Sequence, residues 1–288
     1  MSSRLLQPPD NNLTLRQVVG HPRVVETLAI DDVYSIHDEF NKGLDPALWG
    51  VAKSLEGAQN FHWVEDARQG AVEGVTGGED NADIRLFSRL DTWSPYKRCA
   101  AQMRFNLNSI LNVKFEFGFV TPQYELSDPN FSQGAVDVKS IPFANDIPNY
   151  QVVIYDTDDN TNLGIVAGAR NNDIATSEQI DSESLLADGD NVLSIWANEM
   201  GGTAFWFNGR FYGSTAVQPK DVSDWGTGGD FVSTGDGNPR LRFQDSSYKE
   251  QSGSHLWVYV QNRAGAQDSN VFTIDYIKAW QERHARDF

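Results

Sequence analysis

Carboxylates at alternate positions occur in the segment Asp156-Thr157-Asp158-Asp159-Asn160. Oxygen-bearing side chains at the first, third and fifth positions are the spacing with which a calcium loop begins. An EF-hand is excluded, because it needs glycine at position six and glutamate at position twelve, where this chain has Thr161 and Ala167. A looser calcium site through Asp156, Asp158 and Asn160 stays open. The competing interpretation is a turn whose carboxylates accept local backbone N–H groups.

Aromatic side chains in the segment Leu256-Trp257-Val258-Tyr259-Val260 are a second candidate for chemistry. Alternate residues of a strand point to opposite faces, so Trp257 and Tyr259 share one face and the three aliphatic side chains share the other. Sugar rings stack on exposed aromatic faces, which makes this pair a candidate glycan platform. The alternative is a second core layer in a sheet that is buried on both faces.

Other catalytic chemistries lack their local signatures. The chain has no G-x-S-x-G elbow, no G-x-x-x-x-G-K-[ST] phosphate loop and no G-x-G-x-x-G dinucleotide loop. Its five histidines form no H-x-x-x-H pair, so no histidine zinc site is indicated. The single cysteine, Cys99, excludes an intramolecular disulfide and a thiolate zinc site, and we expect it to be a small buried hydrophobic side chain.

Composition narrows the classes of partner. The 288 residues carry a net charge of −17 at pH 7, and nucleic-acid binding needs clustered Lys and Arg, so a nucleic-acid partner is excluded. With 40% hydrophobic residues the chain can bury one large core, but it has no apolar run of membrane-spanning length. Prolines and charges interrupt the first 30 residues, so no signal peptide is expected. We therefore expect no membrane partner and no classical secretion.

The chain divides by charge into an N-terminal arm and an acidic body. Residues 1–30 carry a net charge of +1, which leaves −18 for residues 31–288. Three prolines and the absence of a 3.6-residue apolar period predict an extended arm over residues 1–34, and the alternative is a tail strand docked on the body. The body is expected to span residues 35–283, with a short tail over 284–288.

The body has the pattern of an all-β protein. Short apolar or alternating runs are separated by Gly, Asn, Asp and Pro clusters about every ten residues. Asn208-Gly209, between Phe207 and Arg210, predicts a tight hairpin because both residues tolerate a positive φ. The clearest predicted strands are Cys99–Asn106, Asn112–Val120, Tyr150–Tyr155, Gly164–Ala169, Asn191–Ala197, Thr203–Phe207, Leu256–Gln261 and Val271–Gln281.

Three segments resemble the concanavalin A-like lectin/glucanase superfamily. They are the opening Asp38-Glu39-Phe40-Asn41 with Leu44-Asp45-Pro46-Ala47-Leu48-Trp49, the hairpin Phe205 to Arg210, and the closing Phe272 to Trp280. The resemblance implies an all-β, two-sheet antiparallel jelly-roll sandwich, here preceded by the extended arm. It also implies that the first and last strands lie side by side. We therefore expect the strand after Phe40 to share a sheet with Val271–Gln281, whose alternation has a period of two throughout.

The resemblance also makes Glu116 a candidate ligand residue. Laminarinase-type enzymes of this superfamily place carboxylates on one strand face in an E-x-D-x-E pattern, whereas the matching face here reads Lys114, Glu116, Gly118. A glycosidase needs two carboxylates, so we expect no enzymatic activity. Glu116 either binds a ligand or pairs with Lys114 or a cross-strand Arg. If the sheets fold as in the superfamily, Trp206 joins Trp257 and Tyr259 in a glycan platform.

Three functions follow from these features, in order of preference. The arm, the missing carboxylates and the acidic body resemble concanavalin A-like domains of tailed-bacteriophage virion proteins. That resemblance implies a non-catalytic capsid or tail decoration, assembled in the host cytoplasm and attached to other virion proteins through the arm. The second function is glycan binding without hydrolysis, for example of a cell-surface glycan. The third is a divergent glycoside hydrolase. Calcium is the only cofactor left open, and self-association stays open as well.

Overall fold

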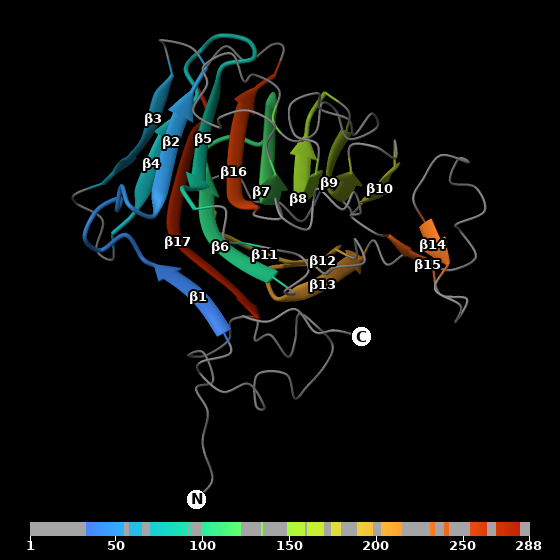
Figure 1. Cartoon of the computed structure of the whole chain (residues 1–288). Helices are drawn as coiled ribbons and strands as arrows, with labels where there is room; N and C mark the ends of the chain where they lie inside the picture. Colours follow the sequence, from blue (N-terminus) through green and yellow to red (C-terminus); the bar gives the residue numbers. More distant parts are fainter. Residues whose placement is uncertain are drawn as a thin grey trace, which may run out of the picture.

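The computed structural model describes residues 33–54, 58–64, 70–90, 93, 99–121, 134, 149–158, 160–169, 174–179, 189–197, 203–214, 231–233, 239–241, 254–263 and 269–282. These residues form strands and connecting turns, and no helix occurs among them (Figure 1). The strands are β1 (Val33–Asp38), β2 (Trp49–Lys53), β3 (Gln59–Trp63), β4 (Val72–Val75), β5 (Asp83–Ser88), β6 (Cys99–Leu107), β7 (Val113–Thr121), β8 (Asn149–Asp156), β9 (Asn160–Ala169), β10 (Ile174–Gln179), β11 (Asn191–Ala197), β12 (Thr203–Phe207), β13 (Arg210–Ser214), β14 (Phe231–Ser233), β15 (Pro239–Leu241), β16 (His255–Asn262) and β17 (Val271–Glu282).

Two antiparallel sheets face each other, as the jelly-roll prediction requires. The first has the order β13-β12-β11-β6-β17-β4-β3, with β1 also paired to β17, and the second has the order β10-β9-β8-β7-β16-β5-β2. We call them the eight-stranded and the seven-stranded sheet. All eight strands predicted from the sequence are present, and the Asn208-Gly209 turn has φ values of 48° and 80° at its two residues. The predicted fold class is therefore confirmed.

One predicted strand pairing is wrong. The strand after Phe40 is β2, which belongs to the seven-stranded sheet and pairs with β5. It is β1, before Phe40, that pairs with β17, from Val33 opposite Glu282 to Asp38 opposite Ile277. β1 therefore crosses the predicted boundary between arm and body at residue 34. Between β1 and β2 the chain passes from the eight-stranded to the seven-stranded sheet. The arm before Val33 and the tail after Glu282 lie outside the described residues.

The last strand also departs from a strict period of two. The register of β17 against β6 shifts between Ile274 and Tyr276, which leaves Asp275 as an extra residue. Ile274 and Ile277 are consequently both buried in the core, although simple alternation places them on opposite faces. A β-bulge of this kind depends on the partner strand, so the alternation of one strand cannot reveal it.

The core lies between the two sheets and is rich in aromatic rings. Phe272 of β17 stacks on Phe105 of β6 at 5.0 Å and on Phe115 of β7 at 5.3 Å between ring centroids. Phe105 and Phe115 come from different sheets, so this trio joins the sandwich across its core. Cys99 is fully buried in the same core, as its sequence context predicted.

We predict that Phe272→Ala lowers the free energy of unfolding by about 3–5 kcal/mol, because it removes a ring that contacts both sheets and leaves a cavity. Urea denaturation measures this loss. Leu111→Ala is the matched control: its side chain is 67% exposed, and its effect should stay within about 0.5 kcal/mol. Equal effects of the two substitutions would contradict the core assignment.

Candidate functional site

The outer face of the seven-stranded sheet collects the polar side chains that the sequence marked as candidates. Along β7, Phe115 and Phe117 point into the core between the sheets, so Lys114 and Glu116 occupy the opposite face. Pairing with β16 places Gln261 beside Lys114 and Tyr259 beside Glu116. Pairing of β16 with β5 continues these rows to Asp83 and Arg85. The result is a layer of polar and aromatic side chains on a sheet that is buried on both faces.

Lys114 and Glu116 form the centre of this layer. Lys114 Nζ lies 3.1 Å from Glu116 Oε1, and both side chains are fully buried. The indole nitrogen of Trp257 donates to Glu116 Oε2 at 2.9 Å. The Lys114 ammonium also lies 5.4 Å from the ring centroid of Tyr259. Burial lowers the pKa of Lys114, and the charge of Glu116 partly offsets that effect. The structure therefore confirms the pairing interpretation of Glu116.

A second buried ion pair lies two strands away, on β5. Arg85 donates to the Asp83 carboxylate through Nε at 2.7 Å and through Nη2 at 3.2 Å. Both side chains have no solvent exposure. Burial raises the pKa of Asp83 to about 6, even though the Arg85 charge acts in the opposite direction. Sequence reasoning missed this pair. The alternation of Asp83 and Arg85 with the apolar residues Ile84 and Leu86 is the sequence pattern that could have indicated this pair.

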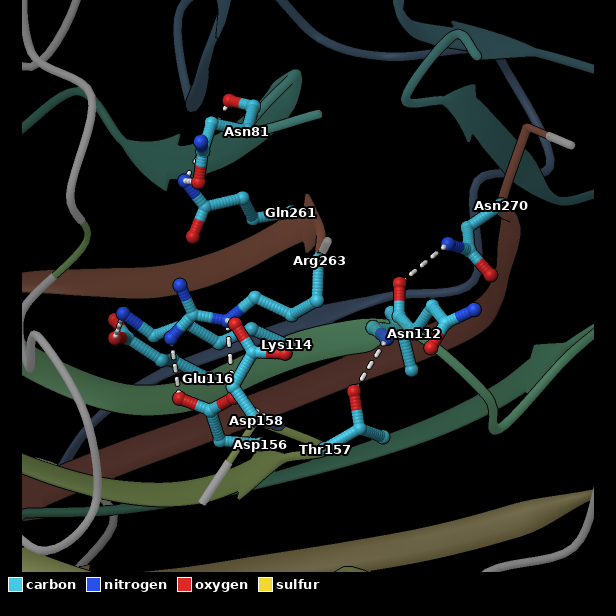
Figure 2. A network of polar contacts seen from close by, with 11 residues as sticks. Asn81, Asn112, Lys114, Glu116, Asp156, Thr157, Asp158, Gln261, Arg263 and Asn270 are labelled. Carbon is cyan, nitrogen blue, oxygen red and sulfur yellow. Dashed lines mark hydrogen bonds and ion pairs between the residues drawn. The ribbon is translucent and has the colours of Figure 1, made fainter. Parts of the chain in front are cut away.

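The candidate calcium residues are engaged by a guanidinium group. Figure 2 shows Arg263 directed at the carboxylates of Asp156 and Asp158. Arg263 Nε donates to Asp156 Oδ1 at 2.9 Å, its Nη2 contacts Asp156 Oδ2, and Nε lies 3.7 Å from Asp158 Oδ2. Asp156 Oδ1 also accepts the backbone N–H of Asp158 at 3.1 Å, which is the predicted turn. The Asn160 side chain lies outside the described part of the chain.

The Arg263 guanidinium group contacts the Asp156 oxygens that a metal ion at this site would bind. No group of three or more His, Cys, Asp or Glu side chains in the described residues could hold a metal ion. In this structure the carboxylates of Asp156 and Asp158 bind the Arg263 guanidinium group, as expected for the turn interpretation.

Near Arg263, hydrogen bonds between polar side chains connect the end of β16 to the residues after β4 and before β17. Asn262 Oδ1 accepts hydrogen bonds from Thr76 Oγ1 at 2.5 Å and from Asn270 Nδ2 at 2.6 Å. Asn270 also reaches the backbone carbonyl of Asn112 at 3.5 Å (Figure 2). This cluster holds together the ends of β16, β17 and β4. Sequence reasoning missed it, because asparagine is common in turns and gives no signal of its partners.

The aromatic candidates do not form one platform. Trp257 and Tyr259 stack with ring centroids 5.6 Å apart, and both are fully buried. Trp206 lies on β12 of the eight-stranded sheet, where it packs with Ala100 on the outer face. The two outer faces point away from each other, so Trp206 does not join Trp257 and Tyr259. Membership of a sheet is a non-local property, and the strand pattern around Trp206 could not reveal it.

At two glycines near Glu116, Gly118 and Gly134, the structure leaves no room for a larger side chain. At Gly118, the next position on the same face, a Cβ atom would lie 2.2 Å from the carbonyl oxygen of Gln151. At Gly134, which has a φ of +71°, a Cβ atom would lie 2.6 Å from Glu116 Oε1, so the main chain there lies against the carboxylate. Nearby, the hydroxyl of Tyr150 is buried and has no hydrogen-bond partner within the described residues. Burial, and then the charge of Glu116, raises its pKa.

Comparison with known proteins identifies the fold. No protein-family model matches the chain, and no curated protein matches it. One similar solved structure comes from work on human gut bacteria that express endo-acting O-glycanases, with a TM-score of 0.51, 10% identity and coverage of 85% of this chain and 98% of that one. Another is a Bacteroides ovatus GH16 protein of a mixed-linkage glucan locus in complex with a product, with a TM-score of 0.50, 10% identity and coverage of 85% and 99%. The carbohydrate recognition domain of Emp47p has a TM-score of 0.49, 11% identity and coverage of 88% and 99%.

At these identities the likeness concerns the fold. The chain shares the two-sheet jelly-roll fold of these structures, which supports the predicted fold class. Among the described residues, no helix is long and apolar enough to cross a membrane.

We predict that Glu116→Gln lowers the free energy of unfolding by about 3–5 kcal/mol, because it leaves the buried Lys114 without its counter-charge. Glutamine keeps an acceptor for Trp257. The double variant Lys114→Met/Glu116→Gln should cost less than the sum of the two single substitutions, and a double-mutant cycle in urea measures the difference. The exposed pair His37–Glu39 is the control, and Glu39→Gln should change stability by less than about 0.5 kcal/mol. Additive single effects would contradict a direct coupling.

Asp83 should give the protein an unusual dependence of stability on pH. Its pKa is raised from 3.8 to about 6 in the folded state, so between these values the folded chain binds more protons than the unfolded chain. The contribution of this group is fully present below pH 3.8 and is lost as the pH rises through 6, by about 3 kcal/mol in total. Unfolding of the wild type and of Asp83→Asn between pH 4 and 7 tests this. The stability of the wild type relative to the variant should fall as the pH rises, and a constant or rising difference would refute it.

Proposed function

We propose that this chain is a non-catalytic interaction protein built on a concanavalin A-like sandwich. The observation that carries the proposal is the buried Lys114–Glu116 pair on β7. β7 offers a single carboxylate, and Gly118 leaves no room for a second one at the next position of the same face. A retaining glycosidase needs two carboxyl groups about 5–5.5 Å apart that flank the scissile bond, with one of them free to act as a nucleophile.

The other carboxylates on this face support the same conclusion. Asp83 is held by Arg85, and Asp156 is held by Arg263. Each of these carboxylates is thus hydrogen-bonded to a cationic side chain, which occupies its oxygens. This arrangement serves stability and leaves no acid/base pair for hydrolysis.

More specifically, we propose that the chain is a virion component of a tailed bacteriophage. Residues 1–34 would attach the sandwich to a capsid or tail protein, and the acidic body, at −18 for residues 31–288, would keep the particle surface soluble. The ten Leu, Val and Ile residues among the first 30 make this segment too apolar for a solvated tail. Attachment through an extended segment uses backbone pairing and side-chain pockets on the partner.

Glycan binding without hydrolysis is the second candidate function. It is favoured by the buried Tyr150 hydroxyl, which lacks a hydrogen-bond partner within the described residues. Calorimetry with gluco-oligosaccharides tests it. Binding that is lost in Tyr150→Phe and kept in Trp63→Ala, on an exposed strand of the other sheet, would favour this function over the first.

We predict that the wild-type protein releases no reducing sugar from soluble β-glucans above the buffer level. Without a free second carboxylate, the oxocarbenium-like transition state lacks either its nucleophile or its proton donor. Glu116→Gln should be indistinguishable from the wild type in this assay. Sugar release that disappears in Glu116→Gln would show that the protein is an enzyme.

We predict that a chain beginning at Asp31 stays folded but no longer copurifies with the assembled particle. The core between the sheets is built from residues after Val33, so the sandwich should keep its cooperative unfolding. Circular dichroism and copurification measure the two properties. A shortened chain that still assembles at full occupancy would refute the attachment role.

A further inference from the structure

The outer face of the eight-stranded sheet has an apolar row that the proposed function does not use. Trp196 on β11 and Trp280 on β17 are the direct neighbours of Ala100 on β6, one on each side. Trp206 on β12 joins the same cluster and is 6% exposed, while Ala100 is fully buried. We call Trp196, Ala100, Trp280 and Trp206 the tryptophan row. An apolar cluster on the outside of a sandwich indicates a surface that another segment covers.

Two indole groups in the row lack hydrogen bonds. The ring nitrogens of Trp196 and Trp280 are closed off from solvent, and neither has an acceptor within the described residues. The core residue Trp93 shares this property, whereas Trp49 donates to Asp38 at 2.8 Å and Trp257 donates to Glu116 at 2.9 Å. A buried donor without an acceptor is costly, so the row favours a covering segment that supplies carbonyl oxygens together with aliphatic side chains.

We propose that residues 1–32 of the same chain dock on the tryptophan row. β1 lies beside β17 (Figure 1). The chain enters β1 at Val33, which pairs with Glu282, and Ser35 pairs with Trp280. Ser35 and Trp196 are three strand spacings apart, about 14 Å at the usual distance between strands. An extended chain of this length reaches several times farther than the row requires, even after a reversal of direction.

The composition of residues 1–32 fits the row. Ten of them are Leu, Val or Ile, and Pro8, Pro9 and Pro22 disfavour a helix, so this composition favours an extended segment whose carbonyl groups could accept the indole protons. Beside the row the charges are mixed: Arg104 is shared between Asp190 and Asp275, and Lys278 lies over the Tyr276 ring.

The same chain is a better occupant than the alternatives. A tethered segment acts at an effective concentration in the millimolar range, which a second copy does not reach in dilute solution. Two bodies that each carry −18 also repel each other. The residues after Glu282 include Arg283, Arg286 and Asp287, so they offer little apolar surface.

This docking concerns the free chain and does not rest on the proposed function; attachment of residues 1–34 to a partner would release them from the row. The experiment is hydrogen–deuterium exchange of the full chain, followed by mass spectrometry of peptides from residues 1–32. In the wild type we expect exchange at least tenfold slower than in an unstructured peptide of the same sequence. Trp196→Ala/Trp280→Ala should abolish most of this protection. Trp63→Ala, on the exposed edge strand β3, is the matched control and should keep it.

The design separates the possible outcomes. Exchange at the unstructured rate in the wild type, or protection that survives Trp196→Ala/Trp280→Ala, would overturn the proposal. Protection that grows with protein concentration over a hundredfold range would assign the row to a second copy and would also overturn it. Peptides from β16 report whether each variant is folded. Should the double variant unfold, Val24→Ser/Val25→Ser tests the same contact from the arm and should raise exchange in residues 1–32 by several fold.

Discussion

A charge that is buried in a sheet with two covered faces must find its counter-charge within the same layer. The outer face of the seven-stranded sheet holds six such groups among the described residues, namely Asp83, Arg85, Lys114, Glu116, Asp156 and Arg263, and all of them are buried. They form three ion pairs, one on β5, one on β7 and one between β8 and the residue that follows β16. In each pair the opposite charge offsets part of the desolvation cost of burial, so removing one side chain of a pair should be destabilising.

This constraint links the fold to the proposed function. Trp257 completes the hydrogen bonding of Glu116, and its ring stacks on Tyr259, so the polar pair and the aromatic pair support each other. A catalytic carboxylate has to change its protonation state or attack a substrate, and a carboxylate fixed by an ammonium and an indole does neither at low cost. The contacts of Glu116 therefore support the structural role that the proposed function gives to this layer of the jelly-roll sandwich.

Local pattern was enough to predict much of this structure. Alternation in β7 and β16 placed Glu116 beside Lys114 and kept Trp257 and Tyr259 on one face, and the Asn208-Gly209 turn located a hairpin. Properties that depend on distant partners could not be predicted. Arg263 is 107 residues from Asp156, the extra residue Asp275 exists only relative to β6, and Trp206 is separated from Trp257 because β12 belongs to the other sheet.

The most direct test of the buried layer is the exchange rate of the Trp257 indole proton, which is hydrogen-bonded to Glu116. Nuclear magnetic resonance with nitrogen-15 labelling follows this single proton in deuterated buffer, with and without gluco-oligosaccharides. A permanently closed layer predicts exchange only through global unfolding, so protection should match the free energy of unfolding and should not change with the sugar. Exchange within minutes, or a resonance that shifts as the oligosaccharide is added, would contradict the closed, non-catalytic face.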